Sequence, residues 1–225
     1  MIKAVLLDVD NTLLDFNKSA SETIKSAFYE LGLTFTDGIF EVFLSTNDML
    51  WRKIEQKEIT RAELHRIRWN IIFEKLGIKA DGHEMERLFL SRLENYAIPV
   101  EGALETVKYL SGKYKLYTAS NAPYAQQVKR LTLSGIIPFI ERILNFEEQG
   151  INKPQKRFFE ECLKAMSPAT KEETVLIGDS LSADMQGGKS VGITTIWFNR
   201  SGSANPPSGL CDYTVKSLAE IKAIL

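Results

Sequence analysis

The sequence predicts a doubly wound α/β fold, in which helices cover both faces of a parallel sheet and a block of helices is inserted after the first strand. Continuous apolar runs, typical of strands buried on both faces of a sheet, recur along the chain. These runs span residues 3–9, 115–120, 174–179 and 194–199, and a weaker one spans residues 142–146. Helical patterns separate most of them, as expected for a sheet built from strand–helix–strand units.

The helices predicted between the strands span residues 102–111, 123–134, 156–166 and 182–191. Strands that alternate with helices build a Rossmann-like parallel sheet, whose ligand crevice lies at the carboxyl ends of the strands. We therefore expect the functional residues to lie directly after the predicted strands.

The stretch that follows the first strand carries only helical patterns, which span residues 18–32, 36–54, 60–76 and 82–96. This stretch is longer than the usual crossover between neighbouring strands of a sheet. We therefore predict two domains. Residues 1–15 and 98–225 form the Rossmann-like core, and residues 16–97 form an α-helical cap domain.

The composition points to a globular protein with a small-molecule partner. Of the 225 residues, 44% are apolar and 25% are charged, which are ordinary globular values. The net charge of −1 provides no basic surface for nucleic acid or an anionic membrane. Two cysteines are too few for a disulfide framework or a zinc site. Without a secretory pattern or an apolar run of roughly 20 residues, we expect a cytoplasmic protein.

Four short polar motifs follow the predicted strands or precede a helix. Because the carboxyl ends of parallel strands meet at one edge of a sheet, residues far apart in sequence can converge there. In chain order the motifs are Asp8-Val9-Asp10-Asn11-Thr12-Leu13, Thr118-Ala119-Ser120-Asn121, Lys153-Pro154, and Gly178-Asp179-Ser180 with Asp184.

This set supplies the parts that phosphoryl transfer requires, namely a nucleophile, a proton source, positive charge and a phosphate cradle. A carboxylate that is aimed and desolvated can attack phosphorus, and Asp8 and Asp10 provide two carboxylates close together. In an extended strand, residues two apart lie on the same face. We expect the chain to turn at Asn11 and Thr12 and to bring both carboxylates towards the substrate. Mutual repulsion would then raise the pKa of one carboxyl group and favour a protonated acid.

The phosphate cradle requires a hydroxyl group and a cation. Ser120 can donate a hydrogen bond to a phosphate oxygen, and Thr118, two residues back on the same strand face, is the alternative. Lys153 can place a positive charge beside Asp8 and the transferring group.

Magnesium prefers oxygen ligands, and the sequence offers carboxylates for it. Asp8, Asp179 and Asp184 are the available side chains, and the Asp10 main-chain carbonyl is a neutral ligand. Asp184 could instead lie on the solvent-exposed face of a helix.

A mechanism based on histidine lacks its base in the predicted core. The two histidines, His65 and His83, both lie in the helical insert. A Ser-His-Asp mechanism is therefore disfavoured.

In their order and content, the motifs DVDNTL, SN, KP and GDSLSAD resemble those of the haloacid dehalogenase superfamily, whose members are mostly phosphatases. The resemblance covers nearly the whole chain, and the helical insert resembles the C1 cap of subfamily I. It implies a magnesium-dependent phosphatase that works through an aspartyl-phosphate intermediate. Asp8 would be the nucleophile and Asp10 the general acid/base.

The same resemblance implies the remaining roles in the site. Ser120, Asn121 and Lys153 would bind the phosphate group of the substrate. The magnesium ligands would be Asp8, Asp10, Asp179 and Asp184.

A narrower resemblance concerns the predicted cap. The stretches NDMLW at residues 47–51 and EIT at residues 58–60 are similar to the cap of bacterial pyrimidine 5′-nucleotidases, which hydrolyse UMP, dUMP and dTMP. This implies a pyrimidine nucleoside monophosphate as substrate, with Asn47 and Trp51 as candidate contacts. For Asn47 the alternative is helix capping, and for Trp51 and Trp69 it is packing in the core.

Other functions of the same core remain open. A sugar-phosphate phosphatase, a phosphoglycolate phosphatase or a β-phosphoglucomutase-like phosphomutase would use the same motifs with a different cap. Dehalogenases that resemble this chain lack the residues that correspond to Asp10, Gly178 and Asp179, which disfavours dehalogenation. A binding module without activity is disfavoured because the acidic set is complete.

Overall fold

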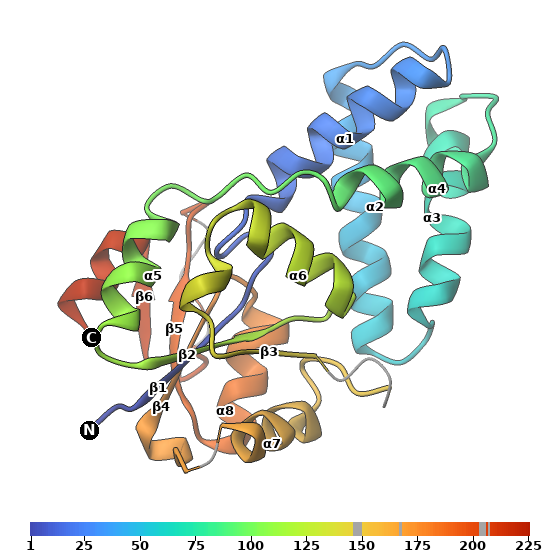
Figure 1. The fold of residues 1–225 in the computed structure, drawn as a ribbon. Helices are drawn as coiled ribbons and strands as arrows, with labels where there is room; N and C mark the ends of the chain where they lie inside the picture. Colours follow the sequence, from blue (N-terminus) through green and yellow to red (C-terminus); the bar gives the residue numbers. More distant parts are fainter. Residues whose placement is uncertain (146–149, 167, 203–205, 207) are drawn as a thin grey trace. The chain divides into compact units, whose positions relative to one another are not determined.

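The computed structural model describes residues 1–145, 150–166, 168–202, 206 and 208–225, and the chain forms two compact units (Figure 1). One unit combines Met1–Phe16 with Ala97–Leu225, and the other is the helical stretch Asn17–Tyr96. Within the described residues, no helix is both long and apolar enough to span a membrane.

The first unit contains a parallel sheet with the strand order β3-β2-β1-β4-β5-β6. Its strands are β1 (Ala4–Leu7), β2 (Lys115–Ala119), β3 (Arg142–Leu144), β4 (Thr174–Gly178), β5 (Thr194–Phe198) and β6 (Tyr213–Val215). The chain builds β2 and β3 on one side of β1 and then β4, β5 and β6 on the other. This arrangement confirms the predicted doubly wound sheet.

Two details of the sheet differ from the sequence-based expectation. Strand β6 was not predicted, because its three residues include two exposed ones and carry little apolar signal. The strand predicted at residues 142–146 is Arg142–Leu144, and Phe146 lies outside the described residues.

Helices cover both faces of the sheet because the side chains of its strands alternate between two apolar clusters (Figure 1). Val5 and Leu7 of β1 belong to one cluster, and Ala4 and Leu6 belong to the other. Full burial of a Leu or Phe side chain stabilises the fold by about 1.5–3 kcal/mol. The first cluster packs against α5 (Ala103–Ser111), α6 (Tyr124–Leu133) and the 3₁₀ helix η5 (Leu218–Ala223), and the second against α7 (Lys156–Ala165) and α8 (Gly187–Val191).

The second unit consists of helices that pack around an aromatic core. Its helices are α1 (Phe16–Glu30, which begins in the first unit), α2 (Asp37–Glu55), α3 (Arg61–Leu76) and α4 (Gly82–Leu93). Trp69 is 1% exposed and contacts Phe28, Phe43, Phe73 and Phe89 with ring centroids 5.6–6.1 Å apart. Trp69 is therefore a core residue of this unit, in agreement with the packing alternative.

Helix starts in this unit follow the polar residues that the sequence places there. The Thr60 side chain accepts from the Glu63 main-chain N–H while Glu63 binds back to Thr60, which forms a capping box at the start of α3. Asp81 accepts hydrogen bonds from the His83 and Glu84 main-chain N–H groups at the start of α4.

Candidate active site

Three neighbouring strands each end directly before a predicted site residue. Asp8 follows β1, Ser120 follows β2 and Asp179 follows β4. Because β1 lies between β2 and β4 and all three run parallel, their carboxyl ends meet at the same edge of the sheet. This is the point where the strand order reverses, at which doubly wound sheets form their ligand crevice.

The chain turns immediately after Asp10. Asn11 adopts a left-handed conformation with φ of 64°, and its N–H donates to the Leu14 carbonyl at 2.6 Å. The Leu13 N–H donates to the Val9 carbonyl at 2.9 Å, which closes the turn. Asp10 therefore no longer belongs to an extended strand, as expected from the sequence.

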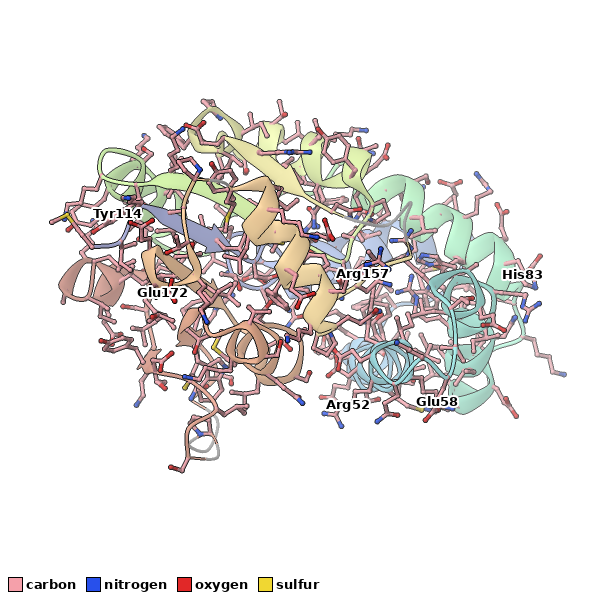
Figure 2. All side chains as sticks on the ribbon, turned by 90° about the horizontal axis from the view of Figure 1, so that it is seen from below. Arg52, Glu58, His83, Tyr114, Arg157 and Glu172 are labelled. Carbon is pink, nitrogen blue, oxygen red and sulfur yellow. The ribbon has the colours of Figure 1, made fainter. Side chains whose placement is uncertain are left out.

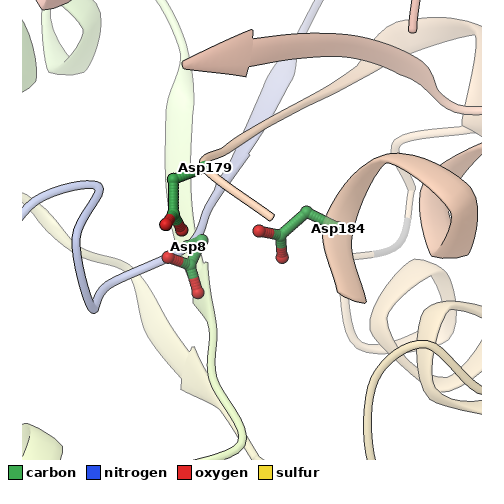
Figure 3. Close-up of side chains that lie close together, drawn as sticks. All are labelled: Asp8, Asp179 and Asp184. Atoms are coloured by element: carbon green, nitrogen blue, oxygen red, sulfur yellow. The ribbon is translucent and has the colours of Figure 1, made fainter. Parts of the chain in front are cut away.

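The carboxylates of Asp8, Asp179 and Asp184 form an acidic cluster at this edge. One carboxylate oxygen of each residue lies within 4.8 Å of an oxygen of both others. Figure 3 shows that the three side chains point towards one another. Asp184 is fully buried, so the alternative of a solvent-exposed helix position is wrong.

A short π-helical segment, Leu181–Gln186, carries Asp184 to the cluster. The Ser180 hydroxyl caps this segment by accepting from the Ala183 N–H at 3.0 Å. Asp184 Oδ2 accepts from the Ser180 N–H at 3.1 Å. A Cβ atom on Gly178 would lie 2.3 Å from that same oxygen, so the approach of Asp184 requires a glycine at position 178.

Lys153 is the cation of the cluster. Its side chain is 4% exposed, and its ammonium group donates to Asp8 Oδ1 at 2.7 Å and to Asp184 Oδ1 at 2.6 Å. A third bond goes to the Ala119 carbonyl at 3.0 Å, so all three ammonium protons are used. Lys153 is thereby held rigidly against β1 and β2.

Burial and crowding shift the pKa values in the cluster. Burial raises the pKa of Asp8 to about 7, the charge of Asp184 adds to the rise, and Lys153 opposes it. Burial, with the charges of Asp8 and Asp184, also raises the pKa of Asp179 well above its ordinary value. Burial acts to lower the pKa of Lys153, but Asp184 and Asp8 outweigh it and raise that pKa, so Lys153 remains a cation.

The cluster has the chemistry of a divalent-cation site. The cluster contains three carboxyl groups and one ammonium group, so ionisation of all three would leave negative charge that these side chains do not balance. Asp8 Oδ2 is buried and accepts no hydrogen bond from the described residues. Carboxylate oxygens are the ligands that magnesium prefers, so these residues fit such an ion.

The Asp10 side chain lies outside the acidic cluster and binds helix α6. Its Oδ1 accepts from Arg130 Nη1 at 2.5 Å, and its Oδ2 accepts from Gln127 Nε2 at 2.8 Å. The sequence-based prediction did not include Gln127 or Arg130. One feature of the sequence could have indicated these two residues. They lie three residues apart, on the face of the helix that also carries the buried Leu131.

Of the two candidate hydroxyl groups, only Ser120 lies beyond the strand end. Thr118 is fully buried within β2, where it pairs with Leu7. The Ser120 hydroxyl accepts from the Ala122 N–H at 3.1 Å and from Gln127 Nε2 at 2.8 Å.

The Asn121 side chain binds the main chain of Lys153. Its oxygen accepts from the Lys153 N–H at 2.8 Å, and its nitrogen donates to the Lys153 carbonyl at 3.1 Å. Asn121 thus joins the loop after β2 to the loop before α7.

The predicted cap contacts both lie on α2. Asn47 is 5% exposed, and its Oδ1 accepts from Arg68 Nη1 at 2.8 Å. Arg68 is itself held by Glu86, with 2.6 Å between Nη2 and Oε1. Trp51 is partly buried beside Leu50.

Both histidines lie in the helical unit. His65 Nδ1 is 2.7 Å from Glu86 Oε1. His83 is exposed at the start of α4, and Figure 2 shows its side chain at the outside of that helix.

Known proteins match this chain over almost its full length. A family model described as haloacid dehalogenase-like hydrolase matches residues 2–192. The HAD-hydrolase YfnB of Bacillus subtilis is 31% identical, with 99% of this chain and 95% of YfnB covered. The magnesium-bound crystal structure of YfnB superposes with a TM-score of 0.93, covering 100% of this chain and 98% of that one.

The names of two further relatives state the substrate class of those proteins. The pyrimidine 5′-nucleotidase PynA of Streptococcus pneumoniae is 31% identical, with 97% of this chain and 93% of PynA covered. The pyrimidine 5′-nucleotidase YjjG of Escherichia coli is 25% identical, with coverages of 98% and 96%.

The chain therefore belongs to the haloacid dehalogenase-like hydrolase family. Within that family it is an enzyme of the phosphatase type, as the motif resemblance implied.

Proposed function

We propose that this enzyme is a magnesium-dependent phosphomonoesterase in which Asp8 attacks the phosphorus of the substrate. The observation that carries this proposal is the state of the Asp8 carboxylate. One oxygen is fixed by Lys153 at 2.7 Å, and the other is buried without a hydrogen-bond partner among the described residues. A carboxylate that is held and desolvated in this way is activated for nucleophilic attack.

The reaction has two steps, transfer of the phosphoryl group to Asp8 and hydrolysis of the phosphorylated Asp8. In the first, a carboxylate oxygen of Asp8 bonds to phosphorus as the bond from phosphorus to the leaving oxygen breaks, and Asp10 gives that oxygen a proton. In the second, Asp10 takes a proton from a water molecule that attacks phosphorus, and the bond to Asp8 breaks. Phosphate is released and Asp8 is regenerated.

We assign the ion to the carboxylates of Asp8, Asp179 and Asp184, together with the Asp10 main-chain carbonyl. When bound, magnesium offsets the negative charge of the cluster and of the transferring phosphoryl group. The excess of carboxyl groups over the single ammonium group in the cluster supports this assignment. Lys153 supplies fixed positive charge, and Ser120 supplies a hydroxyl donor to a phosphate oxygen.

For the substrate we propose a pyrimidine nucleoside 5′-monophosphate, with residues 16–97 acting as a cap domain. The names of PynA and YjjG support this choice. The Asn47 side-chain oxygen accepts a hydrogen bond from Arg68, which leaves the amide N–H groups of Asn47 as the donors. Such donors suit the carbonyl oxygens of uracil or thymine. The partly buried ring of Trp51 offers a surface for stacking.

A substrate panel tests both levels of the proposal. Phosphate release should require magnesium, and kcat/KM should be higher for UMP, dUMP and dTMP than for purine nucleotides, hexose phosphates or phosphoglycolate. Equal or higher values for sugar phosphates would reject the nucleotidase assignment while leaving the phosphatase intact. Asp8→Asn should reduce kcat by at least about a thousandfold, because it removes the nucleophile. A loss of less than tenfold would reject Asp8 as the nucleophile.

A further inference from the structure

Helix α6 directs two buried polar side chains to the end of β1. Gln127 and Arg130 are both fully buried, although long polar side chains are rarely buried without a specific partner. Both bind Asp10, one at each carboxylate oxygen, at 2.8 Å and 2.5 Å. Charge-assisted bonds at both oxygens restrict rotation of the carboxylate, so Asp10 has one defined orientation.

The hydrogen bonds of Gln127 show which way its amide points. A carboxylate can only accept from it, so the amide nitrogen must face Asp10 and the oxygen must face away. One amide hydrogen goes to Asp10 and the other to the Ser120 hydroxyl at 2.8 Å. The amide oxygen is buried without a hydrogen-bond partner among the described residues, so the contacts of the nitrogen determine this orientation.

The same geometry orients the hydroxyl of Ser120. Its oxygen accepts from Gln127 Nε2 and from the Ala122 N–H, which together use its two acceptor positions. The hydroxyl proton is then left to donate. A phosphate oxygen is an acceptor, so this is the orientation that a phosphate-binding serine needs.

We propose that Gln127 and Arg130 are positioning residues for the phosphatase reaction. Arg130 and Gln127 hold the Asp10 carboxylate in place for proton transfer. Gln127 also turns the Ser120 hydroxyl into a donor towards the transferring phosphoryl group. This inference rests on the proposed function, because it assigns these side chains to the acid/base and to the phosphate-binding hydroxyl.

The first test compares substrates whose leaving groups differ in their need for a proton. An alkyl leaving group such as a nucleoside needs one, whereas p-nitrophenolate departs without it. Arg130→Met should therefore lower kcat/KM at least about tenfold more for UMP than for p-nitrophenyl phosphate, because general acids contribute about 10²–10⁴-fold. Arg130→Lys should restore part of the loss. Gln126→Met, at a partly buried side chain of α6 next to Gln127, is the control for the helix and should leave both substrates unaffected.

The second test is a double-mutant cycle that separates the two contacts of Gln127. If Gln127 acts partly through Ser120, Gln127→Met should cost several-fold less in a Ser120→Ala background than in the wild type. Thermal unfolding of each variant shows whether it is folded. If Arg130→Met does not fold, the cycle at Gln127 decides.

The outcomes distinguish this inference from the proposed function. Wild-type protein without phosphatase activity, or an active Asp8→Asn variant, would reject the proposed function. An active wild type and an inactive Asp8→Asn, with equal losses on the two substrates and additive effects in the cycle, would overturn the inference alone. An increase in kcat/KM of Arg130→Met on UMP would also overturn it, because Arg130 would then restrain Asp10 from acting.

Discussion

Lys153 and Asp8 form a buried ion pair 2.7 Å long although 145 positions separate them in the chain. The same ammonium group binds Asp184, so one cation holds two of the three carboxylates in the acidic cluster. The protein itself therefore balances the charge of the site only in part.

Removal of the Lys153 charge should destabilise the protein and abolish its activity. Lys153→Met leaves buried carboxylates without a partner, which typically costs about 3–5 kcal/mol. Urea unfolding in the presence of EDTA measures this cost, and added magnesium should reduce it. Lys156→Met, at a side chain that is 63% exposed, is the matched control and should change stability by less than about 0.5 kcal/mol. A stable and active Lys153→Met variant would contradict the proposed role.

Magnesium binding should weaken as the pH falls below about 7. Burial raises the pKa of Asp8 from 3.8 to about 7, so the metal-free protein carries a proton there that the ion must displace. Titration calorimetry in buffers with different ionisation enthalpies should detect proton release on binding near neutral pH. An affinity that does not change between about pH 6 and about pH 8 would contradict this linkage.

The same shift predicts how the stability of the metal-free protein depends on pH. Between 3.8 and about 7 the folded state binds more protons at Asp8 than the unfolded state does. The contribution of Asp8 to the free energy of unfolding is therefore fully present below the unfolded pKa and is lost as the pH rises through about 7. Asp8→Asn should flatten this dependence in EDTA, whereas Lys156→Met should leave it unchanged.

Gly178→Ala should weaken magnesium binding because the added Cβ would lie 2.3 Å from Asp184 Oδ2. Displacement of this carboxylate should lower the affinity by about 10–100-fold, as for changes that misplace a metal ligand. Overpacking should also destabilise the fold by about 1–3 kcal/mol. Gly38→Ala is the control, because nothing lies within 4 Å of its Cβ position. Equal magnesium affinity in the two variants would show that the close approach at Gly178 is unimportant.

Asn47→Ala should raise KM for UMP while leaving kcat/KM for p-nitrophenyl phosphate unchanged. The first substrate carries a base with carbonyl acceptors for Asn47, and the second does not. A loss of about tenfold to a hundredfold is expected for UMP if a buried hydrogen bond is removed. Asn95→Ala, at an exposed asparagine near the end of α4, is the control. Equal losses on both substrates would point to a structural role for Asn47 through Arg68.

Long apolar strands and amphipathic helices could be predicted from the sequence because their patterns are local. The strands β1, β2, β4 and β5 each consist almost entirely of buried residues. Strand β6 escaped prediction because a short edge strand needs little apolar character.

The order of the motifs along the chain was enough to predict that Asp8, Ser120 and Asp179 meet at one edge of the sheet. Parallel strands impose this convergence whatever the details of packing. The contacts of Asn121 with Lys153, and of Gln127 and Arg130 with Asp10, could not be predicted in this way. They depend on where loops and a helix come to rest against the sheet.

The sequence by itself determined the doubly wound core, the helical insert and the residue types of a phosphatase, because periodicity and strand-end position are properties of the chain. Only the tertiary structure decided how charge is distributed among these residues. In the folded protein Asp184 is buried beside Gly178, and Lys153 forms ion pairs with two carboxylates. Asp10 binds Arg130 of α6. Electrostatic interactions depend on distance and burial in space, and neither can be read from spacing along the chain.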